Sequence, residues 1–347
     1  MVRFSDSNST WLIQLCPYLP AVKRRHVLTR FLLGLLLLVG VGIAGEQLAR
    51  WQARRTLPLP GRWVTVGDHR LHLRTYGTGG PVVVFESGLD TGGSLAWEPV
   101  ARQVAPFATA VTYDRAGLLG SERGTQPKTS AAMAQDLHTL LHRAGYAGPY
   151  LLVGHSLAGV TLRAFIAQYP REVCGVVLVD ASHPDQEQRF PAAHQPAPPP
   201  PLWVVRAVSR LGLVRLFSHE VYPGTQPTDT MNLRNNAYLP TSLPAAVEEQ
   251  QQRSVLLDEA RRVTSFGRLP LIVLTGTSPT RNSEYADKAL RQQITQTWGA
   301  LQQDLLRLST QSTQQLAPRS EHYVQLQQPS LVTDAIKQLL GCPKSMH

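Results

Sequence analysis

The sequence predicts a doubly wound, mostly parallel α/β sheet with an inserted helical cap and an N-terminal transmembrane helix. Short, continuous, β-branched apolar runs alternate with stretches of helical periodicity. This alternation is typical of strands buried on both faces of a parallel sheet. It stops after residue 179 and resumes near residue 269, which indicates an insertion, and one long apolar run precedes all of it.

The N-terminal apolar run covers residues 27–45 and is interrupted only by Thr29 and Arg30. As a helix it would measure about 28 Å, close to the thickness of the hydrocarbon core of a bilayer. The basic triplet at residues 23–25 favours a cytoplasmic N-terminus, so the rest of the chain would lie on the extracytoplasmic side. We therefore expect an uncleaved single-pass anchor. A cleaved signal peptide, which would give a secreted protein, is the alternative.

The positive charge of the chain is concentrated beside this apolar run. The protein has 347 residues, is 43% hydrophobic and carries a formal net charge of +10. Nine basic and only two acidic residues precede Trp63, so this first segment carries +7 and the remainder only +3. Because the basic excess flanks a membrane span and not the globular part, we do not expect nucleic acid as a partner.

The cysteines predict no disulfide framework, and no metal site is predicted. Cys16 precedes the apolar run, Cys174 lies beside an apolar strand, and Cys342 is near the C-terminus. We interpret Cys174 as a small buried hydrophobic residue. No Cys/His cluster has the spacing of a zinc site, and there is no dinucleotide-binding or phosphate-binding loop. We expect neither a cofactor nor a metal.

The globular part begins with a half-exposed antiparallel hairpin. Residues 62–66 and 70–76 alternate apolar and polar side chains around Gly67-Asp68. After this hairpin the pattern changes to buried strands, with an amphipathic helix expected over residues 130–144. The buried strands are predicted at residues 81–85, 109–113, 150–153, 175–179 and 269–274.

The insertion has the composition of a helical cap. A proline run at residues 196–201 precedes an amphipathic helix over 202–217 and a Gln/Glu-rich helix around 245–262. Its apolar side chains form a core, line a substrate cleft or contact the membrane. The predicted organisation is a cytoplasmic segment (1–26), a transmembrane anchor (27–45), a linker (46–61), a first core part (62–182), the cap (183–268) and a second core part (269–347).

The joint that follows the strand 150–153 carries the strongest chemical signal. The serine of Gly154-His155-Ser156-Leu157-Ala158 lies at a tight turn from a strand into a helix. Such a turn projects the hydroxyl above the sheet edge, and the amide of Leu157 points to the same space from the helix N-terminus. Ser156 is therefore a candidate nucleophile, although Ala158 replaces the second glycine of Gly-x-Ser-x-Gly. The alternative is a serine that only caps the helix.

Further motifs occur in a fixed order around this serine. They are Glu86-Ser87-Gly88-Leu89, Tyr113-Asp114-Arg115-Ala116-Gly117, Asp180-Ala181-Ser182-His183-Pro184 and Ser320-Glu321-His322-Tyr323. Together with the serine turn they resemble the α/β-hydrolase superfamily, above all its membrane-anchored or secreted bacterial branch with a Glu-Ser-Gly oxyanion strand. The resemblance covers residues 61–190 and 319–340, and the cap matches no pattern that we can name.

The resemblance implies a serine hydrolase in which serine, acid and histidine follow one another along the chain. His322 occupies the position of the superfamily's histidine, so we expect it to be the general base. His183 is a weaker rival, and His155 is expected to pack or hydrogen-bond locally. The amides of Leu157 and Leu89 would bind the oxyanion.

The position of the acid is left open between several carboxylates. Many relatives carry the acid three residues beyond a glycine after the strand 269–274, but Thr277, Ser278 and Pro279 follow Gly276 here. Other members carry it at the end of the preceding strand, where Asp180 lies. We choose Asp180, whose alternative role is to cap the strand end. The other candidates are Asp185, Asp287 and Glu284.

These residues predict a membrane-anchored serine hydrolase that cleaves carboxylic esters through Ser156, His322 and Asp180. Its partners would be a small-molecule ester or acyl substrate and the membrane. A serine nucleophile argues against haloalkane dehalogenase and epoxide hydrolase chemistry, which needs an aspartate at that place. The alternatives are an aminopeptidase, thioesterase or acyltransferase on the same site, or a catalytically silent binding protein that keeps the fold.

Overall fold

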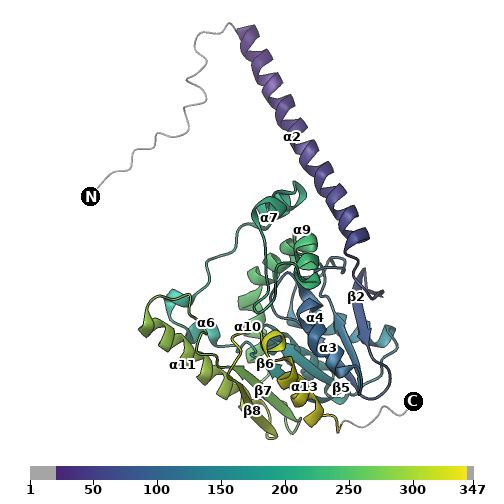
Figure 1. Cartoon of the computed structure of the whole chain (residues 1–347), viewed down its shortest axis with the longest axis vertical. Helices are drawn as coiled ribbons and strands as arrows, with labels where there is room; N and C mark the ends of the chain where they lie inside the picture. The colour runs from purple at the N-terminus through teal and green to yellow at the C-terminus, as the bar shows by residue number, and fades with distance from the viewer. Residues whose placement is uncertain (1–20, 342–347) are drawn as a thin grey trace.

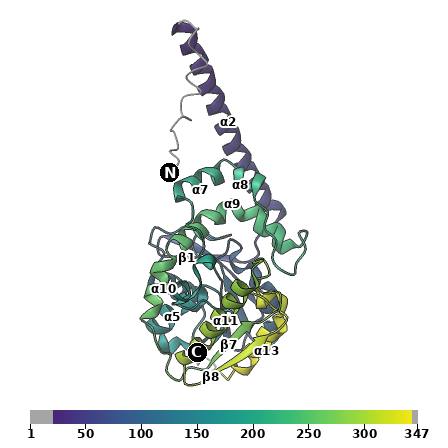
Figure 2. The same ribbon diagram turned by 90° about the vertical axis from the view of Figure 1, so that its left-hand side faces the viewer.

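The computed structural model describes residues 21–341 (Figure 1). Most of the predicted cytoplasmic segment 1–26 therefore lies outside the described residues, as do Cys16 and Cys342. The described chain consists of one long helix that extends away from a layered α/β body (Figures 1 and 2).

The long helix, α2 (Ala21–Thr56), contains the apolar run and continues beyond it. Residues 46–56 include neither glycine nor proline and consist largely of good helix formers, so most of the predicted linker is helical. Among the described residues, α2 is the helix long and apolar enough to cross a membrane, and an N-terminal signal sequence would meet the same criterion.

The described residues of the body form an eight-stranded sheet in the order β1-β2-β4-β3-β5-β6-β7-β8. β1 pairs with β2 and β2 with β4 in antiparallel fashion, and all the other pairs are parallel. This arrangement confirms the predicted mostly parallel α/β fold. The strands are β1 (Arg62–Val66), β2 (His69–Tyr76), β3 (Val82–Glu86), β4 (Thr109–Tyr113), β5 (Tyr150–His155), β6 (Val173–Val179), β7 (Leu271–Gly276) and β8 (Ser312–Ala317).

Helices cover both faces of the sheet. Successive side chains of each central strand point to opposite faces, so a continuous apolar strand presents apolar side chains to the helices on each side. In β3, Val84 packs in the core beneath α4 (Ser130–Arg143) and α5 (Ala158–Gln168). Val83 and Phe85 pack in the core beneath α3 (Glu98–Val104) and α13 (Pro329–Gln338). The continuous apolar strands are explained by these two cores.

The cap segment (residues 183–268) is helical, but its helices are shorter or longer than predicted. The predicted helix 202–217 is two helices, α7 (Leu202–Arg210) and α8 (Leu213–Phe217), because Gly212 adopts a left-handed φ of 75° between them. The predicted helix 245–262 is the end of α9 (Thr230–Gln251) followed by α10 (Arg253–Arg261).

Three larger elements were not predicted, the helices α3 and α11 (Lys288–Leu305) and the strand β8. The remaining short elements are η1 (Gly93–Trp97), η2 (Pro170–Glu172), α6 (Gln186–Arg189), η3 (Ala192–His194), η4 (Leu306–Leu308) and α12 (Val324–Gln327).

Cys174, at the start of β6, is disulfide-bonded. The interpretation of this residue as a simple buried hydrophobic side chain is therefore wrong. Cys174 is only partly buried, and a Cβ atom at its neighbour Gly175 would lie 3.5 Å from Leu339, which follows α13. The first strand residues of β6 thus lie next to the C-terminal end of the described chain.

Candidate active site

Ser156 lies at the turn between β5 and α5, where its backbone adopts a left-handed φ of 52°. The carbonyl of Ser156 accepts hydrogen bonds from the amides of Gly159 (2.9 Å) and Ser182 (2.7 Å), which hold this conformation. A Cβ atom at Gly154 would lie 2.7 Å from the methyl of Ala158. Position 154 therefore requires glycine, whereas position 158 has room for the alanine methyl.

A short hydrogen bond joins the side chains of His322 and Asp180. His322 lies between β8 and α12, and its Nδ1 is 2.6 Å from Oδ2 of Asp180 at the end of β6. Oδ2 also accepts from Arg281 Nη1 (2.9 Å). Oδ1 accepts from the Gly276 amide (3.0 Å) and from Trp298 Nε1 (2.9 Å). The fully buried carboxylate thus accepts four hydrogen bonds.

The charge of Asp180 is favoured by these neighbours. Burial alone would raise its pKa, but the positive charge of Arg281 and the hydrogen bonds from His322 and Trp298 outweigh burial and lower it. An ionised Asp180 accepts a hydrogen bond from Nδ1–H of His322. The other ring nitrogen, Nε2, is then unprotonated and free to accept a proton.

Ser156 and His322 line one cavity of about 350 Å³. Aromatic and charged side chains complete its wall, among them Phe190, Trp298 and Arg253. Among the described side chains there is no hydrogen bond between Ser156 and His322. Contacts between nucleophile and base often tighten only when substrate binds.

The two expected oxyanion donors belong to Leu157, which directly follows Ser156, and to Leu89, in a loop that contacts Ser156. Leu157 is the N-cap of α5, and Leu89 follows Gly88 in the loop after β3. A Cβ atom at Gly88 would lie 2.9 Å from Cβ of Ser156, so this loop contacts the serine directly. Neither of the two amides donates a hydrogen bond to another described residue.

Arg115 holds the loop that carries Leu89. Its guanidinium donates to the carbonyls of Ser87 (2.6 Å) and Gly88 (2.7 Å). Among the described residues, the Gly88–Leu89 peptide is not cis, and the C=O and N–H of a trans peptide point in opposite directions. The contact of Arg115 with the Gly88 carbonyl therefore directs the Leu89 N–H away from Arg115.

Arg115 is itself held by buried carboxylates from two parts of the chain. Its guanidinium contacts Glu86 of β3 at 2.8 Å and Glu249 of α9 at 2.7 Å, and Lys128 Nζ lies 3.1 Å from Glu249. Burial would raise the pKa of Glu249, but the charges of Arg115 and Lys128 lower it to about 2. This network joins the loop beside Ser156 to the cap segment.

The other two candidate histidines, His155 and His183, do not line the cavity that Ser156 and His322 share. His155 is buried, its Nε2 lies 2.9 Å from the carbonyl of His322, and burial lowers its pKa to about 3. It therefore positions the His322 backbone as a neutral side chain. His183 lines a separate depression with Arg163, and burial lowers its pKa to about 4.

The three alternative acids are engaged elsewhere or lack a contact with His322. Asp185 forms an ion pair with Arg261 at 2.8 Å. Asp287 caps α11 by accepting from the amides that follow it. Glu284 lines the same cavity as Ser156, but no hydrogen bond joins it to His322 among the described residues.

Arg281 and Trp298 were not singled out from the sequence. Arg281 lies in the loop after β7, where the resemblance suggested an acid, and Trp298 lies on α11. No signal in the sequence pointed to Arg281, because a cation in this loop indicates a neighbouring acid only once its contact with Asp180 is known. The role of Trp298 could not be predicted, because the helix α11 that carries it was not predicted.

Comparison with known proteins gives one family and several partial relatives. The model of a family described as alpha/beta hydrolase fold matches residues 81–257. The chain is 39% identical over 140 residues to the probable transporter efuK of Hormonema carpetanum, covering 37% of this chain and 19% of that protein. It is 30% identical over 114 residues to an AB hydrolase superfamily protein of Gibberella zeae, covering 32% and 35%. These matches span less than half the length of each relative.

Solved structures are similar over most of the described chain. Cfl2 from Burkholderia cenocepacia has a TM-score of 0.60 at 20% identity and covers 80% of this chain and 95% of its own. A thermophilic esterase from Thermogutta terrifontis has a TM-score of 0.54 at 21% identity, covering 81% and 98%. A putative epoxide hydrolase from Pseudomonas aeruginosa has a TM-score of 0.59 at 19% identity, covering 81% and 97%. At these identities the likeness shows the fold alone.

Proposed function

The chain belongs to the α/β hydrolase fold family, and from this premise we propose that it is a membrane-anchored serine hydrolase that cleaves carboxylic esters. One observation carries the proposal. The Asp180–His322 pair, at 2.6 Å, lies beside a cavity that His322 shares with Ser156. Serine, base and orienting acid are the three groups that acyl transfer requires.

In the proposed mechanism Ser156 Oγ attacks the ester carbonyl carbon while Nε2 of His322 takes the hydroxyl proton. Asp180 holds Nδ1–H of His322 and stabilises the imidazolium that forms. His322 then gives its proton to the leaving alcohol, and an acyl-enzyme remains on Ser156. A water molecule, deprotonated by His322, attacks this ester, and collapse of the second tetrahedral intermediate releases the carboxylic acid and restores Ser156.

The oxyanion of both tetrahedral intermediates would accept hydrogen bonds from the amides of Leu157 and Leu89. Loss of one such donor typically lowers the rate by about 10²- to 10³-fold. Two observations support this role. Neither amide donates to another described residue, and Arg115 donates a hydrogen bond to the Gly88 carbonyl and so orients the following amide of Leu89. Arg115 is in this proposal a positioning residue, because it acts through the loop and does not touch the substrate.

We propose further that α2 remains attached as an anchor and that the hydrolase domain lies outside the cytoplasm. Glu46, just past the apolar run, is buried and accepts from Arg215 of α8 at 2.7 Å. Cleavage near Ala44 would leave this contact at a new chain end. The disulfide of Cys174 favours the extracytoplasmic side, since disulfides persist in oxidising compartments.

Labelling with a fluorophosphonate probe tests the proposed chemistry on the full chain in detergent. The wild type should be labelled, and Ser156→Ala and His322→Ala should not. The matched control is His183→Ala, which removes a histidine outside the catalytic cavity and should leave labelling unchanged. A folded wild-type protein without labelling would instead indicate a binding protein that has kept the fold.

A further inference from the structure

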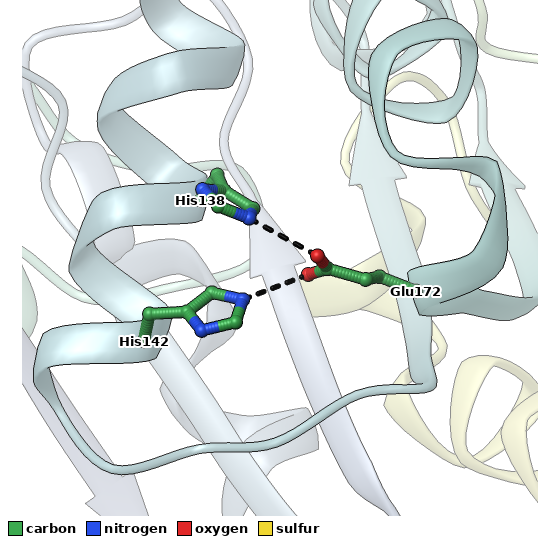
Figure 3. Close-up of side chains that lie close together, drawn as sticks. All are labelled: His138, His142 and Glu172. Atoms are coloured by element: carbon green, nitrogen blue, oxygen red, sulfur yellow. Dashed lines mark hydrogen bonds and ion pairs between the residues drawn. The ribbon is translucent and has the colours of Figure 1, made fainter.

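A cluster of three potential metal ligands lies on α4 and η2, and Figure 3 shows their side chains pointing toward one another. His138 and His142 are one helical turn apart, and Glu172 faces both. Nε2 of His138 lies 3.0 Å from Oε1 of Glu172, and Nε2 of His142 lies 3.1 Å from Oε2. The three ligand atoms lie within 4.8 Å of one another.

This geometry matches the ligand set of a first-row transition metal. Zinc binds imidazole nitrogen and carboxylate oxygen at about 2.0–2.2 Å, so tetrahedral ligands lie about 3.4 Å apart. The two histidine–glutamate separations, 3.0 Å to Oε1 and 3.1 Å to Oε2, differ from that value by a few tenths of an ångström. They involve different carboxylate oxygens and the set as a whole spans up to 4.8 Å, so small side-chain rotations would bring the three ligand atoms onto one ion. His138 is also held in place, because its ring stacks on Tyr169 with centroids 3.9 Å apart and planes inclined by 9°.

We propose that His138, His142 and Glu172 bind a divalent transition-metal ion, with Zn²⁺ the best match. Two neutral imidazoles and one carboxylate supply three ligands, and water would complete the coordination on the side where His142 is half exposed. This set was not singled out from the sequence, where no metal was expected. The histidine pair is four residues apart in the sequence, but its third ligand comes from a separate segment.

The ion would have a structural role. Glu172 directly precedes β6, and Asp180 directly follows it. A strand of this length spans about 20 Å, so an ion at Glu172 cannot touch the reacting atoms at the other end. It would instead connect α4 to the turn that enters β6. The proposal is therefore independent of the proposed esterase activity.

Titration of Zn²⁺ into the chelator-treated full chain, purified without a histidine tag, tests the site. Calorimetry should show saturable binding to the wild type, and its melting temperature should rise with Zn²⁺. His142→Ala and Glu172→Gln should each weaken binding by at least about 10-fold. Glu172→Gln keeps the shape and one oxygen of the side chain, which separates metal affinity from local packing.

The matched control is His219→Ala, which removes an exposed histidine of the cap segment. It should bind Zn²⁺ as the wild type does. The proposal is overturned if the wild type shows no saturable binding, or if the cluster variants bind as tightly as the control.

A second surface is formed by α7 and α8, which lie beside the proposed membrane anchor α2 (Figure 2). Arg215 of α8 contacts Glu46 of α2 at 2.7 and 3.2 Å. Gly42 packs so closely on the turn between α7 and α8 that a Cβ atom there would lie 2.9 Å from the Leu211 carbonyl oxygen. These contacts place α8 at the level where the apolar run of α2 ends.

Large apolar side chains are uncovered at this level. Trp203, Leu216 and Phe217 are 72%, 73% and 83% exposed. Arg206 and Arg210 on α7 add positive charge, which suits the anionic headgroups of a bilayer. Apolar side chains flanked by basic ones, next to a membrane span, have the composition of an interfacial surface.

We infer that α7 and α8 dock onto the bilayer from which α2 emerges, with Trp203, Leu216 and Phe217 inserted among the lipids. The occupant is membrane lipid because the surface adjoins α2, whose apolar residues are exposed and form a helix long enough to cross a bilayer. The inference rests on the proposed anchoring, but it concerns the orientation of the domain and not its attachment.

Photocrosslinking in vesicles of phosphatidylcholine and phosphatidylglycerol tests this inference. The full chain would carry p-benzoylphenylalanine in place of Phe217, of Leu36 within the apolar run, or of the exposed Leu316 on β8. Lipid adducts are expected from positions 36 and 217 and not from 316. Adducts from 36 without adducts from 217 overturn the docking and keep the anchor, whereas their absence from both overturns the anchor as well.

Discussion

The substitution Asp180→Asn separates the proposed acid from its alternatives with a minimal change of shape. Oδ1 accepts from Gly276 and Trp298, and Oδ2 accepts from His322 and Arg281. Because the first two donors require an oxygen, the asparagine carbonyl takes the place of Oδ1. Its NH₂ group then occupies the place of Oδ2 and faces two donors.

His322 can satisfy this NH₂ group only by presenting an unprotonated Nδ1. Its proton would move to Nε2, the atom that must accept the proton of Ser156. A wrong histidine tautomer of this kind lowers kcat in a serine protease by about 10⁴-fold. That factor corresponds to about 5 kcal/mol of activation free energy at about 1.4 kcal/mol for each tenfold. We expect a loss of about 10³- to 10⁴-fold in kcat and little change in KM.

The assay is the hydrolysis of a p-nitrophenyl ester by the full chain in detergent, with the melting temperature measured in parallel. Arg281 loses a charged partner, but it still donates to the carbonyl of Glu321 at 2.9 Å, so the variant should fold. The matched controls are Asp185→Asn and Glu284→Gln, which should retain activity. A folded Asp180→Asn protein with turnover within tenfold of the wild type would refute the assignment.

Three further predictions concern the surroundings of the site. Gly88→Ala places a methyl group 2.9 Å from Cβ of Ser156 and should slow fluorophosphonate labelling by about 10²-fold; an unchanged rate would contradict the position of this loop. Glu249→Ala leaves Arg115 buried without its α9 partner and should lower the free energy of unfolding by about 3–5 kcal/mol, measured by denaturant titration. Burial raises the pKa of Asp90 to about 7. The folded protein therefore holds a proton on Asp90 between about pH 4 and pH 7 that the unfolded chain releases, so the contribution of Asp90 to stability should fall as the pH rises through this range. The difference in melting temperature between Asp90→Asn and the wild type should therefore shift in favour of the variant from pH 5 to pH 8, and a difference that does not change with pH would count against the raised pKa.

The central strands were predictable because burial on both faces leaves a continuous apolar signal. In β6, for example, Val176 and Val177 enter opposite cores. The edge strand β8 has only one neighbour, and Gln314, Gln315 and Leu316 are exposed or half exposed. Its sequence therefore lacks both the apolar run and a regular alternation, and the strand was missed.

The serine turn was predictable for a local reason, whereas the acid was not. Ser156, Gly154 and Ala158 are neighbours in the sequence, and one tight turn determines how they are arranged. The environment of Asp180 depends on Arg281 from a loop and Trp298 from a helix, each about a hundred or more residues away. A carboxylate after Gly276 would have signalled the acid directly, and a cation in that loop carries no such signal by itself.

Ser156 and Asp180 share a backbone feature that bears on the choice of acid. They lie at the ends of the neighbouring strands β5 and β6, with left-handed φ angles of 52° and 43°. A non-glycine residue in this region costs of order 1–3 kcal/mol and persists where surrounding contacts hold it. Here the Ser182 amide donates to the Ser156 carbonyl at 2.7 Å, and the Asp180 amide donates to the Leu274 carbonyl at 2.7 Å. A residue that only capped the strand end would not need this conformation, and glycine would adopt it at lower cost. The strain at Asp180 is explained if its carboxylate must reach across β7 to His322. The backbones of Asp185, Asp287 and Glu284 show no such strain, so the left-handed φ favours Asp180 as the acid.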